Sequence, residues 1–478
     1  MGVIWLIAKD EWRYWARTKL ALVVIIIGLV LTVASVVVNS IQMSHAKHER
    51  DHLQQSADKQ FLEQPDRHPH RMVHYGHYVF RTPSPLSIVD PGVDAYTGTA
   101  IFLEGHQQNS AMFADQRQSS GLTRFSSLSP AFLLQILMPL LIIMVGYGAI
   151  TREKEQGTIA ILITQGVGEY KLLIGKFLAL LTLGSMLLLP LLFASIYAIF
   201  VGESALLSGI FVLSYLLYVA IWSALVVWVS SITAKGQSSF AISIGLWIAF
   251  SILIPRVASS TAATMMPSAG KLESDFAVLD ELRKLGDGHI AIDPAFAQLQ
   301  ANLLTQYNAE SIDELPINFR GAVAEYSENQ LTEVLNQFAE TRMHEELSQA
   351  KIARLFGWLS PTLSIRSASM ALAGTHLETH HRFLREAEAL RFEFVQSLNR
   401  VHREKLSYEA DINRYKDKST AQNARVDSSN WQVLSAFEFK SQKPQQRLVQ
   451  SFLYFLQLLF CLGFAFCLIG LTARRLLK

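Results

Sequence analysis

Long runs of apolar residues alternate with polar segments along the chain, and six of these runs have the length of a membrane span. A helix needs about 20 apolar residues to cross the hydrocarbon core of a bilayer, and about 17 is the lower limit. The pattern therefore predicts an α-helical polytopic membrane protein with six transmembrane helices, of which the fifth is the shortest. The predicted spans are residues 20–41, 131–150, 172–200, 205–232, 238–254 and 448–471.

The segments that separate these spans differ in length and character. Residues 1–19 alternate apolar side chains such as Ile7 and Trp12 with basic ones such as Lys9 and Arg13. This pattern is typical of an amphipathic helix that lies in the membrane interface. The two longest segments are expected outside the cytoplasm. The predicted segments are 42–130 (first extracytoplasmic segment), 151–171 (cytoplasmic coupling segment), 255–447 (helical extracytoplasmic domain) and 472–478 (cytoplasmic tail).

The distribution of basic residues predicts which side of the membrane each segment occupies. Six spans place both ends of the chain on one side, and both ends are basic, with Lys9 and Arg13 at the start and Arg474 and Arg475 at the end. The turn between the third and fourth spans contains Glu203 and no basic residue. Because short loops rich in Lys and Arg face the cytoplasm, we expect both termini to be cytoplasmic.

Apolar residues recur every three or four positions in parts of the second long segment, which predicts amphipathic helices there. Between two such patterns, Ser360-Pro361 and Gly374 are the residue types that begin and end a helix. No strand-like alternation competes in this segment. The two patterns are Leu331, Val334, Leu335 and Phe338, and Leu384, Ala387, Leu390, Phe394, Leu398 and Val401.

The composition supports the membrane assignment. The chain of 478 residues is 50% hydrophobic and 17% charged, which excludes an ordinary soluble protein of this size. Its net charge of +2 carries little information, because the charges are divided between the two membrane faces. Its only cysteines, Cys461 and Cys467, lie in the last apolar run, so no disulfide framework is predicted for the external segments.

A short charged stretch between the second and third spans, residues 151–176, stands out from the apolar sequence around it. Gly157 ends its charged first part, an apolar turn follows, and Gly166 and Gly168 permit a sharp reversal before the next span. Its charged residues are Arg152, Glu153, Lys154, Glu155, Glu169, Lys171 and Lys176. Such a density of charge indicates a loop that meets something in water.

This order of features resembles the cytoplasmic coupling segment of type-two (ABC-2 type) ABC exporter permeases. The resemblance implies that the segment docks into a cleft of a separate ATPase subunit. An ordinary charged loop is the alternative, because such loops are common between membrane helices. Exporters of the wider type often have Pro and Ser where this chain has Gly166 and Gly168, which indicates a looser turn. The residues assigned to ATPase coupling are Arg152, Glu153, Lys154, Glu155, Gly157 and Thr158.

Three strings in the external segments are similar to a bacterial subfamily of these permeases that has large helical ectodomains. They are HYGHYVFRTPSPLSIVDPGVDAYTG at 74–98, LPINFRG at 315–321 and LSPTLSIRSASMALAGT at 359–375. With the coupling segment and the spans, the similarity covers nearly the whole chain. It implies an architecture and a class of protein but no transported substrate.

The resemblance implies a permease subunit that is not itself an enzyme. The nearest candidate for a phosphate-binding loop, residues 168–177, has six residues between its glycines, and Phe177 stands where Ser or Thr would hold magnesium. We therefore expect ATP and Mg²⁺ on two copies of a separate ABC ATPase. A second permease, identical or paralogous, should complete the unit in the bacterial inner membrane. We further expect contact with membrane lipid and a periplasmic partner, and none with nucleic acid; export and mechanotransmission to that partner both stay open.

All fourteen histidines lie in the two external segments. His70 and His74 are four residues apart, and His106 could complete a site with them. His45, His48 and His52 would share one helix face. Imidazole suits zinc and copper, so either set predicts a Zn or Cu site, with solvated polar surface as the alternative. A metal-handling membrane protein is therefore one alternative function. An ectodomain sensor that does not transport is the other.

Two further features concern helix packing and charge. Arg366 lies in an otherwise small and apolar helix, where a charge is costly unless it is paired. A salt bridge to an ectodomain acid is the expected role, and contact with an anionic substrate is the alternative. Gly146, Gly148 and Gly184 should allow close approach of the second and third spans.

Overall fold

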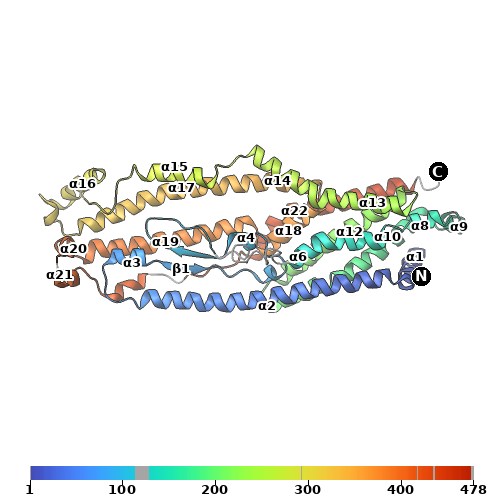
Figure 1. Ribbon diagram of the computed structural model, residues 1–478, viewed down its shortest axis with the longest axis horizontal. Helices are drawn as coiled ribbons and strands as arrows, with labels where there is room; N and C mark the ends of the chain where they lie inside the picture. Colours follow the sequence, from blue (N-terminus) through green and yellow to red (C-terminus); the bar gives the residue numbers. More distant parts are fainter. Residues whose placement is uncertain (1, 113–128, 292, 417, 434–436, 475–478) are drawn as a thin grey trace.

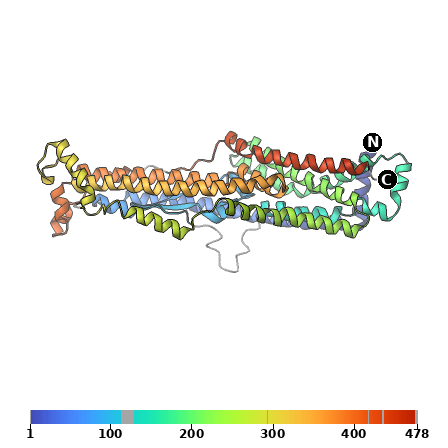
Figure 2. The ribbon, with the colours of Figure 1, turned by 90° about the horizontal axis from the view of Figure 1, so that it is seen from above.

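The computed structural model describes residues 2–112, 129–291, 293–416, 418–433 and 437–474. The molecule is elongated, and most helices run along its long axis (Figure 1). Both termini lie at one end, and α16 (Ala297–Tyr307), α20 (Tyr408–Asn413) and α21 (Lys418–Asn423) lie at the other. The view turned by 90° shows the same rod, with α17 (Phe319–Leu355) beside α19 (Leu377–Lys405) (Figure 2).

Six helices within the described residues are long and apolar enough to cross a membrane, which confirms the predicted number of spans. Four of them are single helices: α2 (Leu20–Leu62), α10 (Glu169–Leu187), α12 (Ala205–Ile232) and α22 (Pro444–Ala473). The second span joins α6 (Pro130–Phe132), η3 (Leu133–Leu137), α7 (Met138–Gly146) and α8 (Thr151–Glu155). The fifth span joins α13 (Gly236–Ile248), η4 (Ala249–Leu253) and α14 (Ile254–Met265). We call these helices, with α1 (Val3–Thr18), α9 (Thr158–Thr164), α11 (Leu189–Phe200) and α18 (Pro361–Ala373), the membrane half.

Three predicted spans differ in extent from the helices that the structure forms. The first span was expected to end at residue 41, but α2 continues without a break to Leu62. The third was expected as one helix, whereas it divides at Leu188 into α10 and α11, because Pro190 cannot donate a backbone hydrogen bond. The fifth continues to Met265, since the π-helical turn η4 accommodates the following Pro255 within a continuous helix.

Helix α12 is the centre of the membrane half. Most of it is buried, whereas few residues of the joined helix α13 to α14 are buried. The predicted close approach holds at two of the three glycines: a Cβ atom at Gly146 or Gly184 would overlap a side chain of a neighbouring helix. It fails at Gly148, where a Cβ atom would meet nothing. The large buried side chains of α12 are Phe211, Tyr215, Tyr218 and Trp222.

Helix α18 packs among the apolar helices α12 and α22 of the membrane half, although it lies within residues 255–447, which were expected to be external. The Tyr218 hydroxyl lies 3.0 Å from Thr362 Oγ1 at the beginning of α18. Tyr218 is near the middle of α12, about 20 Å from its outer end at 1.5 Å per residue. The chain therefore returns into the membrane half through η7 (Phe356–Trp358) and leaves it along α18.

The buried surroundings explain how this re-entrant segment satisfies its polar groups. Ser360 caps α18 by accepting from the Leu363 N–H, and its hydroxyl donates to the Phe250 carbonyl at 2.6 Å. Gly374 ends the helix in the left-handed conformation, as its position predicts. Non-helical backbone at membrane depth is tolerated only where protein surrounds it. At the outer end, Arg447 forms a buried pair with Glu203 at 3.0 Å and donates to the Leu372 carbonyl.

The rest of the chain forms a distal lobe around α17 and α19, which confirms that helices form at both patterns. The apolar face of the second pattern lies in the core, whereas the four apolar residues of the first pattern are only half-buried. The core of the lobe includes Phe61, Val73, Phe394 and Trp431. A two-stranded antiparallel sheet, which the sequence did not predict, pairs β1 (His77–Phe80) with β2 (Ala100–Leu103) in the register His77↔Leu103. The remaining elements are α3 (Pro69–Tyr75), η1 (Pro85–Ile88), α4 (Asp94–Thr97), α15 (Lys271–Leu282), η5 (Pro294–Phe296), η6 (Ile312–Glu314) and η8 (Ser428–Val433).

We expect the distal lobe to lose stability as the pH falls from 6.5 to 4. Burial lowers the pKa of His376 and of His380 to about 4. Below its pKa of about 6.5 the unfolded chain binds a proton at each of these sites, while the folded protein does not. The free energy of unfolding should therefore fall by up to about 1.4 kcal/mol per pH unit for each histidine in this window. Thermal unfolding of the full-length protein at pH 7.5, 6 and 5 measures the slope.

The double variant His376→Gln, His380→Gln should flatten this slope, and His344→Gln, an exposed histidine on α17, should leave it unchanged. An unfolding temperature that is the same at pH 7.5 and pH 5 would contradict the assignment of neutral buried histidines.

Candidate functional site

The predicted coupling segment forms two short helices at the end of the molecule that holds both termini (Figure 1). Gly157, with a φ of 70°, separates α8 from α9, and Gly166, with a φ of 84°, follows α9. Positive φ angles of this size favour glycine, so the expected turns fall at these two positions. The Thr158 hydroxyl donates to the Glu153 carboxylate across the first turn, which fixes α9 on α8.

A buried ion network holds α8 to α1 and to the third span, α10. Glu11 of α1 is only 1% exposed, and its Oε2 accepts from Arg152 Nη2 at 2.7 Å and from Lys176 Nζ at 2.5 Å. Lys176 also donates to Glu153 Oε1 at 2.9 Å. The guanidinium of Arg152 lies 3.6 Å from the ring centroid of Tyr14. Two acids and two bases balance, so the buried charges are paired.

The next two residues connect the segment to the loop after α12. Lys154 Nζ donates to the carbonyls of Ser231 and Thr233 at 2.5 and 2.9 Å. Glu155 Oε1 accepts from the Gly236 N–H at 3.0 Å, at the beginning of α13. The charged part of the segment is therefore fixed within its own chain.

The surface that stays open at this end belongs to α9. None of its residues is buried, and Ile161 is 56% exposed. The sequence analysis assigned coupling to residues 152–155, 157 and 158, which face inward or lie at the turn, and it did not single out Ile161. It also missed Glu11, whose signal was an acid three residues after Ala8 and four before Trp15, on the buried face of α1.

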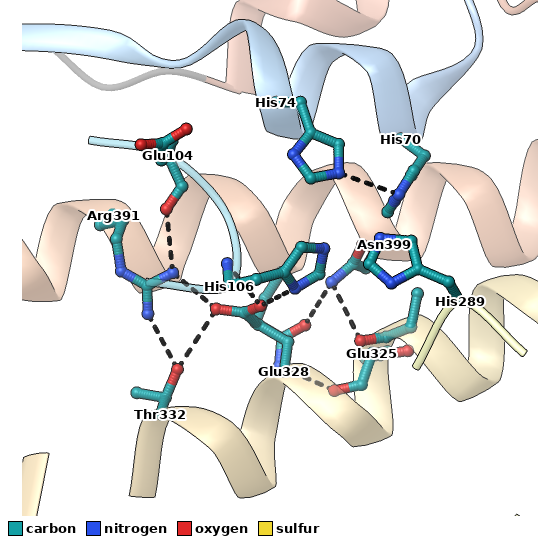
Figure 3. A network of polar contacts seen from close by, with 12 residues as sticks. His70, His74, Glu104, His106, His289, Glu325, Glu328, Thr332, Arg391 and Asn399 are labelled. Carbon is teal, nitrogen blue, oxygen red and sulfur yellow. Dashed lines mark hydrogen bonds and ion pairs between the residues drawn. The ribbon is translucent and has the colours of Figure 1, made fainter. Parts of the chain in front are cut away.

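The distal lobe brings together the three histidines His70, His74 and His106, which the sequence analysis proposed as a metal site. His70 and His74 lie on α3, and His106 lies in the turn after β2. His289, which the sequence analysis did not include, joins them from the loop after α15 (Figure 3). The four offer ligand atoms that all lie within 4.8 Å of one another. His45, His48 and His52 are exposed on α2 and belong to no such group among the described residues.

A buried acid supports His106 from behind. Glu328 Oε2 lies 3.0 Å from His106 Nδ1, and Glu328 Oε1 lies 2.5 Å from Arg391 Nη1. Burial opposes ionisation of Glu328, but the His106 hydrogen bond and the Arg391 charge outweigh it and lower the pKa of this carboxyl. Burial, helped by the charge of His74, lowers the pKa of His70 to about 2, so its imidazole is neutral at physiological pH.

A third polar cluster joins α3, α19 and α20. Asp411 accepts from His402 Nε2 at 2.7 Å and lies 3.0 Å from His68 Nε2. Asn318 and Arg414 also donate to this carboxylate. Burial opposes its ionisation, but the hydrogen bonds from His402 and His68 hold the pKa of Asp411 well below its usual range.

Arg366 differs from its expected role. Its side chain is exposed, and it forms no ion pair or hydrogen bond within the described residues. Burial raises the pKa of Asp90, and the charge of Arg366 is one of several influences that oppose this rise. The predicted salt bridge is therefore not formed among the described residues.

Comparison with known proteins finds matches over two parts of the chain. Residues 102–272 match the ABC-2 family transporter proteins, and residues 272–440 match a domain of unknown function (DUF3526). The first match contains the coupling segment, and the second contains most of the distal lobe's helices. The protein of Pseudomonas aeruginosa described as "Probable ABC transporter permease protein NosY" is 34% identical over 124 residues, which is 24% of this chain and 45% of NosY.

The match thus spans less than half the length of that curated relative. It nevertheless agrees with the family match and with the six apolar helices. Together these findings support an ABC-2 type permease.

Proposed function

We propose that this chain is the membrane subunit of an ATP-driven ABC transporter and that α9 is where its ATPase docks. The observation that carries the proposal is the contrast within the coupling segment. The charged residues of α8 are bound inside the chain, whereas the apolar side chain of Ile161 projects from α9 with no partner of its own. ATP and Mg²⁺ would be held by two copies of the separate ATPase.

The contacts of α8 support a route by which ATPase closure would move the membrane helices. Displacing α9 would move α8 through the hydrogen bond from Thr158 to Glu153. Lys176 and Glu11 would pass that displacement to α10 and α1, and Glu155 would pass it to α13. Allosteric coupling needs an element with two arrangements that both sites bias, and the membrane helices fill that role here.

The re-entrant helix supports transmission to the distal lobe. Tyr215 of α12 bonds Ser369 at 2.9 Å, so α18 moves with the central helix. Helix α18 is continuous in sequence with α17 and α19, the two long helices of the lobe. The chain would thus export cargo or drive a periplasmic partner mechanically. A non-transporting sensor would need the same lobe but no ATPase contact at α9.

The position of Arg366 supports a second permease, identical or paralogous, against this chain. It lies on α18 between Thr362 and Ser369, both of which contact the middle part of α12. A charge facing lipid at such a depth costs about 2.5–3.5 kcal/mol or more. A partner subunit or a water-filled cavity between two subunits would remove that cost.

Replacing Ile161 with Glu should reduce co-purification of the ATPase at least tenfold and abolish its stimulation by the permease. A carboxylate at the centre of an apolar contact must lose its hydration without gaining a partner. Ile161→Leu is the matched control and should retain both properties. Both variants should keep the wild-type unfolding temperature, since α9 has no buried residue.

Glu153→Lys provides the contrasting variant. It would leave Lys176 beside a new positive charge, so it should cost about 3–5 kcal/mol of stability as well as activity. Normal ATPase binding and stimulation by Ile161→Glu would disprove docking at α9.

The proposed orientation in the bacterial inner membrane, with cytoplasmic termini, predicts which surface residues an impermeant thiol reagent reaches in intact cells. In a background without Cys461 and Cys467, Ser110→Cys in the distal lobe should be labelled, and Gln156→Cys beside α9 should react only after the cells are broken. Both positions are exposed, so accessibility within the fold is matched. Labelling at 156 in intact cells would reverse the orientation.

A photoactivatable amino acid at position 366 should cross-link to a second permease subunit in native membranes. The same amino acid at Phe193, an exposed apolar position of α11, serves as the comparison for lipid. Cross-links from position 366 to lipid alone would exclude a subunit contact there.

A further inference from the structure

The four histidines of the distal lobe have the separations of a metal site. Their six ring-centroid distances run from 4.6 to 5.9 Å, so each imidazole lies next to the other three (Figure 3). The Nε2 atoms of His70 and His74 are 3.1 Å apart. Two nitrogens bound to one tetrahedral zinc ion at 2.0–2.1 Å are separated by about 3.3 Å. The two exposed members, His74 and His289, can approach by rotation of their side chains.

Hydrogen bonds orient two of the rings with a free nitrogen toward the others. Nδ1 of His106 is paired with the Glu328 carboxylate. Nε2 of the same ring is buried and has no hydrogen-bond partner among the described atoms. Asp287 Oδ1 lies 3.0 Å from Nδ1 of His289, which leaves its Nε2 available. Ligating histidines in metal sites commonly donate their second nitrogen to a carboxylate in this way.

The backbone also holds His106 in place. Its φ is 65°, a conformation that few residues other than glycine adopt. Its N–H lies 3.3 Å from Glu328 Oε2, so the acid that binds the ring also holds the turn. Backbone strain of this kind persists where the surrounding structure enforces it, and it is concentrated at functional sites.

The neighbouring cluster around Asp411 shows why only one of the two histidine groups suits a cation. There the carboxylate is filled by His68, His402 and Asn318, and the guanidinium of Arg414 already supplies a positive charge. That group is a complete hydrogen-bonded network. The four-histidine group has an unfilled nitrogen and no cation among its members.

We propose that His70, His74, His106 and His289 bind one divalent transition-metal ion, Zn²⁺ or Cu²⁺. Four neutral nitrogen ligands favour these ions over Ca²⁺ and Mg²⁺, which prefer oxygen. The ion joins parts of the chain that are distant in sequence: α3 and the turn after β2 from the first external segment, and the loop between α15 and α16 from the second. Binding therefore fastens that loop to the body of the distal lobe. This inference is independent of ATPase docking at α9.

Titration of the chelator-stripped full-length protein with Zn²⁺ or Cu²⁺ tests the site. The wild type should bind one ion per chain with a rise in unfolding temperature, because a ligand that binds only the folded state stabilises it. His289→Ala should weaken binding at least tenfold, and His70→Ala, His74→Ala, His106→Ala together should abolish it. Asp287→Asn should weaken binding about tenfold to a hundredfold while leaving all four ligands in place.

His344→Ala, which removes an exposed histidine of α17 outside the cluster, is the matched control and should bind like the wild type. Asp287→Asn and His289→Ala change an exposed loop, so they separate loss of the site from loss of the fold. Equal affinity in wild type and triple variant, or weak binding in both with no thermal shift, would overturn the proposal. An equal loss of binding in His344→Ala would also overturn it.

Discussion

The burial of Glu11 is the constraint on which the end of the molecule that holds both termini depends. A carboxylate that is 1% exposed persists only when cations reach it, and here Arg152 and Lys176 come from two other helices. Replacing a whole buried pair by apolar residues can be neutral, but removing one member costs about 3–5 kcal/mol. The interaction therefore contributes less to total stability than to fixing α1, α8 and α10 as one body. A coupling helix that is mounted on such a body can transmit force, whereas one on a free loop cannot.

Elsewhere in the membrane half, buried polar groups are satisfied by uncharged hydrogen-bond partners rather than by ion pairs. The turn between α17 and α18 brings backbone and hydroxyl groups deep among the spans, where no water satisfies them. Hydroxyls of Tyr218 and Ser360 fill these hydrogen bonds, and Gln457 of α22 donates to the Arg354 carbonyl at 3.0 Å. The polar groups of α18 and of the turn before it thus form hydrogen bonds with the membrane-spanning helices. These bonds tie the distal lobe to α12 and α22.

The sequence predicted what depends on local pattern, and it missed what depends on partners far along the chain. Span four was placed at residues 205–232, where α12 lies, because its apolar run is unbroken. Helix α18 was predicted with the right ends but in the wrong place, since its burial depends on tyrosines about 150 residues away. His289 could not be joined to His70 and His74, because a single histidine carries no spacing signal. The strands β1 and β2 are too short for alternation to identify them.

The two candidate sites, α9 and the four-histidine cluster, lie toward opposite ends of the molecule. The helices between them determine whether a displacement at one site reaches the other. Helix α2 runs unbroken for 43 residues, about 65 Å at 1.5 Å per residue, from the membrane half to the core of the distal lobe at Phe61. Its inner end packs against α1 and α10, the helices joined by Glu11 and Lys176. A displacement at α9 can therefore reach the lobe along α2 as well as through α18. The loop with His289 lies outside both routes, so a metal ion there would brace the part of the lobe that neither helix holds.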